Sequence, residues 1–260
     1  MQSKIESNYV ELRERILFGE LPAGTSMSSE DVIQLTGVSL SMARQLLLAL
    51  GSAGYLTKTG RIYSVATFTR QQVEEWRLTF ASIVEIGALR LALSGQDRLD
   101  EAEAFLEGRL RNVAVEDEAF FLGAVSYSTV ILGGPHSSLA KLVEQLVPQA
   151  FFRLLWLSDI YAKRTGFMVE ASDQFFLAAR SQDLSGVRAA ARFFFDNTAP
   201  ALDILITQMS LGNYPENVKT DGFHTIEPKI SGYQMHARTP QSSSPLIAPY
   251  RDAYLTCPLF

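Results

Sequence analysis

The chain contains few of the residues that catalysis and metal binding usually need. Its 260 residues include one cysteine, Cys257, and three histidines, His136, His224 and His236. A single cysteine excludes an internal disulfide framework and suits a reducing compartment. So few histidines disfavour a Ser/His/Asp set, and no Gly-rich phosphate loop lies between a strand and a helix. We therefore expect no catalytic residues, no cofactor and a protein that is not an enzyme.

Long apolar runs are also missing. No stretch reaches the roughly 20 apolar residues that cross a membrane, and the first residues do not have the pattern of a signal peptide. The hydrophobic fraction of 47% and the charged fraction of 20% are typical of a globular protein. We expect a cytoplasmic protein of one large or two modest domains, with no membrane partner.

A positive net charge, typical of proteins that coat nucleic acid, is absent as well. The formal net charge is −5. Residues 1–70 contain seven Lys/Arg and six Asp/Glu, a net +1, whereas residues 71–212 contain twelve and eighteen, a net −6. The N-terminal part is therefore the least acidic folded part without being a basic domain. Any affinity for nucleic acid must come from a few well-placed cations, doubled in a dimer.

One stretch, residues 36–47, has the pattern of a helix-turn-helix. Gly37 permits the tight turn, and the hydroxyl of Ser39 is suited to cap the following helix. On the core side of that helix the apolar residues are Val38, Ala43, Leu46, Leu47 and Leu50. The opposite face, where a recognition helix meets DNA, carries Ser39, Ser41, Arg44 and Gln45. An ordinary corner between two helices has the same local pattern, so that alternative stays open for the motif alone.

The neighbouring segments predict a winged helix over residues 1–67. A helix is expected over 8–18, ended by Gly19, and a second one starts at Ser28-x-x-Asp31. The candidate recognition helix covers 39–51. Two short strands, 54–57 and 62–65, follow and enclose a turn that contains Lys58 and Arg61. Both cations are candidate DNA contacts on the wing.

Several features recur together between residues 12 and 65: the run Leu-Arg-Glu-Arg-Ile-Leu-Phe-Gly-Glu-Leu-Pro-Ala-Gly at 12–24, the turn Gly37-Val38-Ser39, and then Arg44, Leu47, Leu50, Gly54, Leu56 and Val65. With these residues the N-terminal part resembles the GntR family of bacterial transcription regulators. The resemblance implies a DNA-binding domain that binds operator DNA as a homodimer.

The departures from this family fall on positions that face DNA. Asp31 stands where the family usually has an arginine early in the second helix, and Leu40 where an arginine often follows the Gly-Val-Ser turn. Ile62 replaces the glycine that lets the wing approach the minor groove. Each lost cation removes roughly one unit from the salt dependence of binding. The residues thus predict weakened or altered DNA recognition.

Residues 68–212 predict an antiparallel all-α bundle. A capping box, Thr69-x-x-Gln72, opens a long helix to about residue 92. Further helices are expected over 98–113, 115–132, 137–162, 168–181 and 184–211, joined by short breaks. Three groups of residues stand out in this part: Glu85 with Ala88 and Leu91, Gly133-Gly134 before Ser138-Leu139, and Ala178 with Asp183 and 189–191. With these residues the part resembles the helical ligand-sensing (FCD) domain of the FadR branch of the GntR family.

Many members of that branch hold a divalent metal inside the bundle, through an Asp, a His one turn later and two further His. The corresponding positions in this chain are Gly123, Tyr127, Ser172 and Phe194, none of which is a customary ligand. The family's ligand-gripping arginine falls on Ala81. No histidine occurs between residues 137 and 223. We therefore expect no metal.

Aromatic residues stand where the metal site would be. A filled core is the first interpretation, because aromatics at helical spacing usually pack. The alternative is a pocket for an apolar or aromatic small-molecule effector, lined by Tyr127, Phe152, Trp156, Ser172, Phe176 and Phe194, with charge from Arg77. The acyl-CoA-responsive member of the branch also works without a metal. A surface-paired arginine is the simpler interpretation of Arg77.

Residues 213–260 hold six of the ten prolines and are expected to form an extended or disordered tail. The leading hypothesis is a ligand-responsive, metal-independent transcription regulator that binds operator DNA as a dimer. One alternative is a regulator fold that has lost operator binding and serves as a small-molecule or protein-binding module. A remote alternative is an enzyme that uses the aromatic cavity. Effector, operator sequence and sign of regulation are not predicted.

Overall fold

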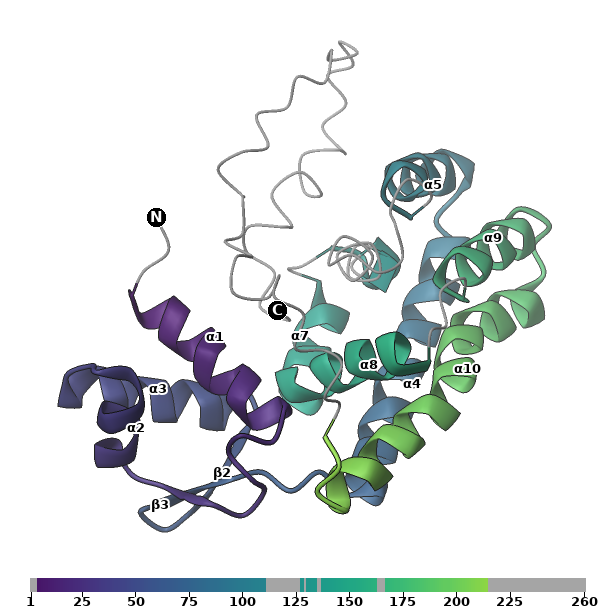
Figure 1. The fold of residues 1–260 in the computed structure, drawn as a ribbon. Coiled ribbons are helices and arrows are strands. Elements are labelled where there is room, and N and C mark those ends of the chain that lie inside the picture. The colour runs from purple at the N-terminus through teal and green to yellow at the C-terminus, as the bar shows by residue number, and fades with distance from the viewer. Residues whose placement is uncertain (1–3, 111–126, 129, 135–136, 163–166, 215–260) are drawn as a thin grey trace. The chain divides into compact units, whose positions relative to one another are not determined.

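The structure is a computed structural model that describes residues 4–110, 127–128, 130–134, 137–162 and 167–214 (Figure 1). Within these residues the chain is mainly helical, with one small antiparallel sheet. Contacts divide the described residues into two compact units. The N-terminal unit holds residues up to Thr67 together with 208–214, and the helical unit holds Phe68–Thr207.

The N-terminal unit is a winged helix, as the sequence predicts. Its elements in chain order are α1 (Lys4–Leu17), β1 (Ser26–Met27), α2 (Ser29–Thr36), α3 (Leu40–Ser52), β2 (Leu56–Thr59) and β3 (Ile62–Val65). The strand order is β1-β3-β2, with Ser26 opposite Ser64 and Thr59 opposite Ile62. The third strand, β1, was not expected, because two residues carry no alternation pattern and pair with β3 only through the tertiary fold.

The core of this unit lies between the three helices and the sheet. The predicted core side of α3 is buried, since Ala43, Leu46, Leu47 and Leu50 are at most 3% exposed. They pack with further buried apolar residues from each element, namely Leu12, Ile16, Leu17, Met27, Val32, Leu56 and Val65. Each fully buried leucine of this kind contributes about 1.5–3 kcal/mol relative to an exposed one. The burial fixes which face of α3 points outward.

Gly19 ends α1 in the way the sequence predicts. Its φ is +76°, a left-handed conformation that favours glycine. The ring of Tyr214, in the segment after α10 (Leu184–Ser210), occupies the place that a Cβ at position 19 would take. The glycine therefore serves both the turn and the close approach of this ring.

The helical unit contains α4 (Arg70–Ala92), α5 (Gln96–Leu110), α7 (Ser138–Leu146), α8 (Gln149–Ala162), α9 (Phe167–Arg180) and most of α10. Its first helix begins with the predicted capping box between Thr69 and Gln72. Helices α4 and α10 run antiparallel, because the ion-pair partners Arg70–Asp203 and Glu85–Arg192 step along α4 and α10 in opposite directions (Figure 1).

The prediction of one helix over 137–162 is wrong. Pro148 separates α7 from α8, and Val147 before it is extended, with φ −120° and ψ 115°. Proline lacks an N–H and its ring disfavours a helical backbone at the preceding residue, which explains the break. The predicted helix 115–132 falls mostly, and the predicted tail 215–260 entirely, outside the described residues.

No single helix in the described ranges is long and apolar enough to cross a membrane. Only α2 and α3 taken together meet that criterion, and they are bent by 106° at the break between them.

Candidate nucleic-acid interface

The turn between α2 and α3 is built by local backbone chemistry. Gly37 has φ 66° and ψ 24°, and its N–H donates to the carbonyl of Ile33 at 2.8 Å, which closes α2. Ser39 is the N-cap of α3, as predicted, and its hydroxyl accepts from the N–H of Met42. The 106° bend between the helices lies within the roughly 90–120° of a helix-turn-helix. This geometry makes α3 the candidate recognition helix.

The outward face of α3 carries all four residues expected there. Ser39, Ser41, Arg44 and Gln45 are exposed. The same face also carries two leucines, Leu40 at 42% and Leu48 at 60% exposure. From the sequence, Leu40 was interpreted as a lost cation, and Leu48 was given no role. The signal for Leu48 was its spacing, since a residue four positions after Arg44 shares its helix face.

Arg44 and Arg61 are free to meet an external anion. Within the described part of the chain neither side chain makes a hydrogen bond or an ion pair. Other arginines of the N-terminal unit are engaged: Arg13 pairs with Glu14, and Arg15 pairs with Glu11 at 2.7 Å. The arginines that are not neutralised internally are thus the two expected to bind DNA.

The wing is attached to α3 through an aromatic ring. The ammonium of Lys58 lies 5.2 Å from the ring centroid of Tyr63, a cation–π distance. A Cβ on Gly51 of α3 would lie 3.1 Å from the same ring, so Tyr63 packs directly on the helix backbone. Gly60, with φ 61°, makes the turn between β2 and β3. Lys58 and Arg61 are therefore presented by a hairpin held against α3.

Asp31 has a structural role that explains its presence. Its carboxylate accepts from the backbone N–H and the hydroxyl of Ser28, both at 2.7 Å, and completes the capping box of α2. The backbone hydrogen bond and then the hydroxyl hydrogen bond hold the pKa of Asp31 below its usual value. The side chain is exposed and ionised at neutral pH. The charge that stabilises α2 therefore also opposes the approach of phosphate.

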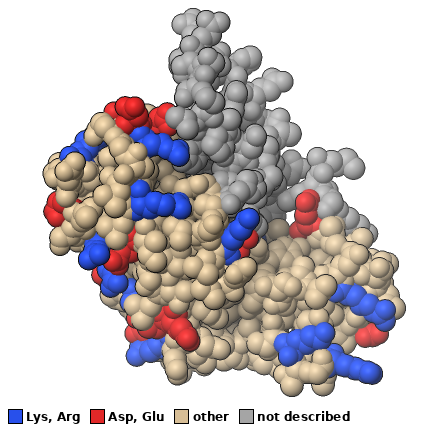
Figure 2. All heavy atoms as spheres, turned by 180° about the vertical axis from the view of Figure 1, so that it is seen from behind, with Lys and Arg blue, Asp and Glu red and all other residues tan. Residues whose placement is uncertain are grey.

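The molecular surface has no large positive region on the face shown in Figure 2. Lys and Arg atoms form separate clusters, most of them beside Asp or Glu atoms, and uncharged surface predominates. This agrees with the near-neutral charge of residues 1–70. Binding to a phosphate backbone would rest on a few unpaired cations.

The residues predicted to line an effector pocket are buried in the helical unit. Tyr127, Phe152, Trp156, Ser172, Phe176 and Phe194 are all at most 9% exposed. The rings of Phe152 and Phe176 pack edge to face with other rings. The ring centroids of Phe80 and Phe152 are 5.1 Å apart, and those of Phe175 and Phe176 are 5.0 Å apart. The guanidinium of Arg153 lies 5.3 Å from the ring of Trp156. These contacts are those of a filled aromatic core.

Tyr127 differs from the other aromatic residues because its hydroxyl is buried without a hydrogen-bond partner among the described residues. Burial alone raises the pKa of this hydroxyl far above its usual value. A buried hydroxyl without a partner costs about 1–3 kcal/mol relative to a satisfied one. Among the residues predicted to line a pocket, Tyr127 is therefore the one with a buried polar group that no described residue satisfies.

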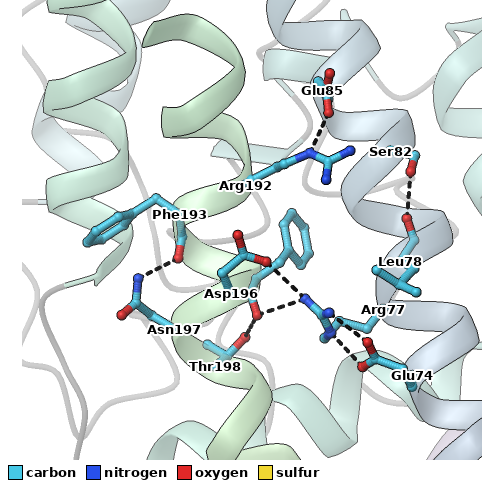
Figure 3. A network of polar contacts seen from close by, with 11 residues as sticks. Glu74, Arg77, Leu78, Ser82, Glu85, Arg192, Phe193, Asp196, Asn197 and Thr198 are labelled. Carbon is cyan, nitrogen blue, oxygen red and sulfur yellow. Dashed lines mark hydrogen bonds and ion pairs between the residues drawn. The ribbon is translucent and has the colours of Figure 1, made fainter. Parts of the chain in front are cut away.

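Arg77 links α4 to α10 (Figure 3). Its Nε and one terminal nitrogen donate to the two carboxylate oxygens of Glu74, both at 2.7 Å. The other terminal nitrogen donates to the carbonyl of Phe195 at 3.2 Å and to Asp196 at 3.3 Å. The hydrogen bonds to Glu74 are the main cause that raises the pKa of Arg77. All three nitrogens are engaged, which favours a structural tether over a counter-ion for a ligand.

Glu85 of α4 forms a second link in the same helix pair. It pairs with Arg192 at 2.6 Å, as Figure 3 shows, and with Arg188 at 3.5 Å, so it also joins α4 to α10. In the ranges that the structure describes, no three His, Cys, Asp or Glu side chains are placed to hold a metal ion. Of the positions expected to correspond to metal ligands, Tyr127, Ser172 and Phe194 are buried, and Gly123 lies outside those ranges.

Comparisons with known proteins support the architecture. No protein-family model and no curated protein matches the chain. Among solved structures, a GntR transcriptional regulator from Rhodococcus sp. RHA1 is similar with a TM-score of 0.52 and 15% identity, covering 77% of this chain and 98% of that one. Lar, which controls expression of the Listeria monocytogenes agr system, is similar with a TM-score of 0.58 and 15% identity, covering 79% and 99%.

At this level of identity the similarity shows a shared fold. The chain is a winged-helix protein with a following helical unit, and it has the fold of a GntR-type transcription regulator. Membership of the FadR branch, with its ligand-sensing domain, stays a prediction.

The Arg77 tether predicts a pH-dependent stability. Arg77→Met leaves Glu74 and Asp196 without their partner and should lower the free energy of unfolding by about 1–2 kcal/mol at neutral pH, a value discounted because both carboxylates are partly exposed. Arg77 lowers the pKa of Glu74, so the stabilisation is complete above the unfolded value of 4.5 and is lost as the pH falls through the lower folded value. Urea unfolding at neutral and acidic pH measures this difference.

Arg180→Met is the matched control, because Arg180 pairs with Asp100 and Glu103 at a more exposed position. It should cost less than the change at Arg77. Equal costs for the two variants, or a cost at Arg77 that does not become smaller in acid, would contradict the tether.

The unpartnered hydroxyl predicts that Tyr127→Phe stabilises the ligand-free protein, by about 1 kcal/mol, because it removes a buried polar atom and keeps the ring. Tyr127→Leu should destabilise, because it also removes ring contacts. Thermal unfolding followed by circular dichroism distinguishes these outcomes. A loss of stability in Tyr127→Phe would mean that the hydroxyl is satisfied in solution.

Proposed function

We propose that this chain is a transcription regulator that binds operator DNA through its N-terminal unit. The observation that carries the proposal is Arg44, which lies on the exposed face of a capped α3 and has no partner among the residues that the structure describes. The helix-turn-helix bend and the fold shared with Lar, which controls expression of the agr system, support the same function. Bacterial origin and a cytoplasmic location belong to this proposal.

In the proposed complex α3 enters the major groove and the wing lies against the backbone. The N-terminal residues of a recognition helix contact base edges, which assigns Ser39, Ser41, Arg44 and Gln45 to this role. Lys58 and Arg61, presented by the β2–β3 hairpin, contact phosphates. A homodimer would place two copies of α3 in successive major-groove turns, about 34 Å apart.

We further propose that the helical unit senses a small molecule without a metal, in the manner of the FadR branch. The support is the set of buried aromatic residues in the helical unit and the hydroxyl of Tyr127, which has no partner among the described residues. Such a ligand would be apolar or aromatic with one hydrogen-bonding group. Its binding would regulate DNA affinity through the setting of the two units. Mass spectrometry of small molecules released from the purified protein would identify it.

A second candidate function is a regulator fold without operator binding, acting on a protein or small-molecule partner. The acidic Asp31 and the exposed apolar side chains of Leu40 and Ile62 favour it. A mobility-shift assay with DNA that flanks the protein's own gene separates the two functions. A regulator binds its own promoter DNA at low salt, where even non-specific binding is detectable, whereas the second candidate does not.

Arg44→Ala tests the proposed interface. Removing a guanine-contacting arginine should weaken operator binding by about 1–3 kcal/mol. Arg61→Ala should instead lower the salt dependence, the slope of log K against log salt, by roughly one unit, because it removes one phosphate contact. Fluorescence anisotropy of labelled promoter DNA over a salt series measures both quantities.

Arg180→Ala is the control, since this arginine lies in the helical unit and pairs with Asp100 and Glu103. Its affinity and slope should equal those of the wild type. If Arg44→Ala also matches the wild type, α3 is not the DNA-binding element.

The capping box predicts that Asp31 limits DNA affinity. Asp31→Asn removes the charge but keeps an oxygen that accepts from the Ser28 N–H. Binding at low salt should strengthen by roughly two- to fivefold, and the gain should shrink as salt screens the charge. Asp31→Ala removes the acceptor as well and should in addition cost about 1 kcal/mol of stability. Unchanged affinity in both variants would place Asp31 away from the DNA.

A further inference from the structure

The exposed face of α3 has an unusual composition for a helix that approaches phosphate. Leu40, Arg44 and Leu48 follow one another at intervals of four residues and form a single row along the helix. Leu40 is 42% and Leu48 60% exposed. By helix geometry Leu48 lies opposite the buried side, and Leu40 lies at its edge. The row therefore consists of one unpaired cation between two apolar side chains.

These leucines do not serve the core. The core side of α3 is occupied by Ala43, Leu46, Leu47 and Leu50, each at most 3% exposed. Single exposed leucines are common on protein surfaces and need no explanation. Two in one row, on either side of the single exposed arginine of this helix, indicate a surface whose partner has apolar groups beside an anionic or acceptor group.

The major-groove edge of DNA offers this combination. Guanine presents N7 and O6, which accept a bidentate pair of hydrogen bonds from arginine, and thymine presents an apolar C5-methyl group. Residues four apart are separated by about 6 Å along a helix, which is roughly the rise of two base pairs at 3.4 Å each. The row therefore matches a guanine with a thymine up to two base pairs to either side.

We propose that Leu40 and Leu48 determine specificity by contacting thymine methyl groups on either side of a guanine bound by Arg44. This inference rests on the proposed DNA-binding function. Leucine has no hydrogen-bonding group, so it cannot satisfy the exposed amino group of cytosine or adenine and favours the methyl group instead. The two leucines also exclude water from the Arg44 hydrogen bonds, which strengthens them. Leu40 is in this view a selective contact and not merely a lost cation.

Substitution of thymine by uracil provides a direct test, because it removes only the C5-methyl group. The full-length protein first selects its site from a pool of randomised duplexes. Each thymine beside the selected guanine is then replaced by uracil, and affinity is measured by fluorescence anisotropy for the wild type and Leu40→Ala. We expect roughly a three- to fivefold loss from uracil at the contacted position, the contribution of about one buried methyl group.

The two changes should not be additive. If Leu40 contacts the methyl group, Leu40→Ala should lose roughly as much as uracil does, and uracil should cost Leu40→Ala little more. Leu48→Ala should show the same coupling to the thymine on the other side. Leu142→Ala, at an exposed leucine of α7 that is 37% exposed, is the control and should leave the uracil effect unchanged. Equal helicity by circular dichroism verifies that the variants fold.

The outcomes separate this inference from the function on which it rests. Selected sites without thymine beside the guanine, or additive effects of uracil and Leu40→Ala, overturn the inference while Arg44-dependent DNA binding stands. Failure to bind any duplex at low salt overturns both and assigns the leucine row to a protein partner. Coupled losses at both leucines support the inference.

Discussion

The burial of one side of α3 is the constraint on which the candidate interface depends. Four apolar residues, Ala43, Leu46, Leu47 and Leu50, pack into the core of the N-terminal unit. Because a helix has 3.6 residues per turn, burying these positions also determines which residues are exposed on its other side. The N-cap at Ser39 and the left-handed Gly37 fix where the helix begins and how it leaves α2. The position of Arg44 on the outside is thus a consequence of packing, before any partner is considered.

A conflict between folding and binding is concentrated at Asp31. As the third residue of α2 it stabilises the helix by accepting from Ser28 and by placing a negative charge near the helix N-terminus. The same charge is unfavourable for a phosphate backbone. An arginine there would gain a phosphate contact and lose the capping box. The chain has the residue that suits its own fold, so in the proposed complex the affinity would come from base contacts by α3 and from cations of the wing.

Much of the fold was predictable because the decisive signals are local. Capping boxes at Ser28 and Thr69 and the left-handed Gly19 and Gly37 each act within a few residues, and the structure confirms them. Strand β1 and the break at Pro148 were missed for opposite reasons. The strand exists only through pairing with β3, which sequence periodicity does not contain. The proline is a local signal whose effect depends on context, since Pro200 lies inside α10 without ending it.

The candidate site was predictable in its position and less so in its chemistry. Spacing identified Arg44 as exposed. No sequence pattern could show that Arg77 has three partners while Arg44 has none in the described ranges of the chain. In the sequence, Arg44 and Arg77 are both arginines within a predicted helix, and nothing distinguishes them. Only the tertiary fold brings Asp196 and the carbonyl of Phe195 to Arg77. Pairing within the fold separates the arginines that hold the protein together from those left available to a ligand. By that criterion Arg77 belongs to the framework of the helical unit. Arg44 belongs to the surface of the N-terminal unit that is left available to a ligand.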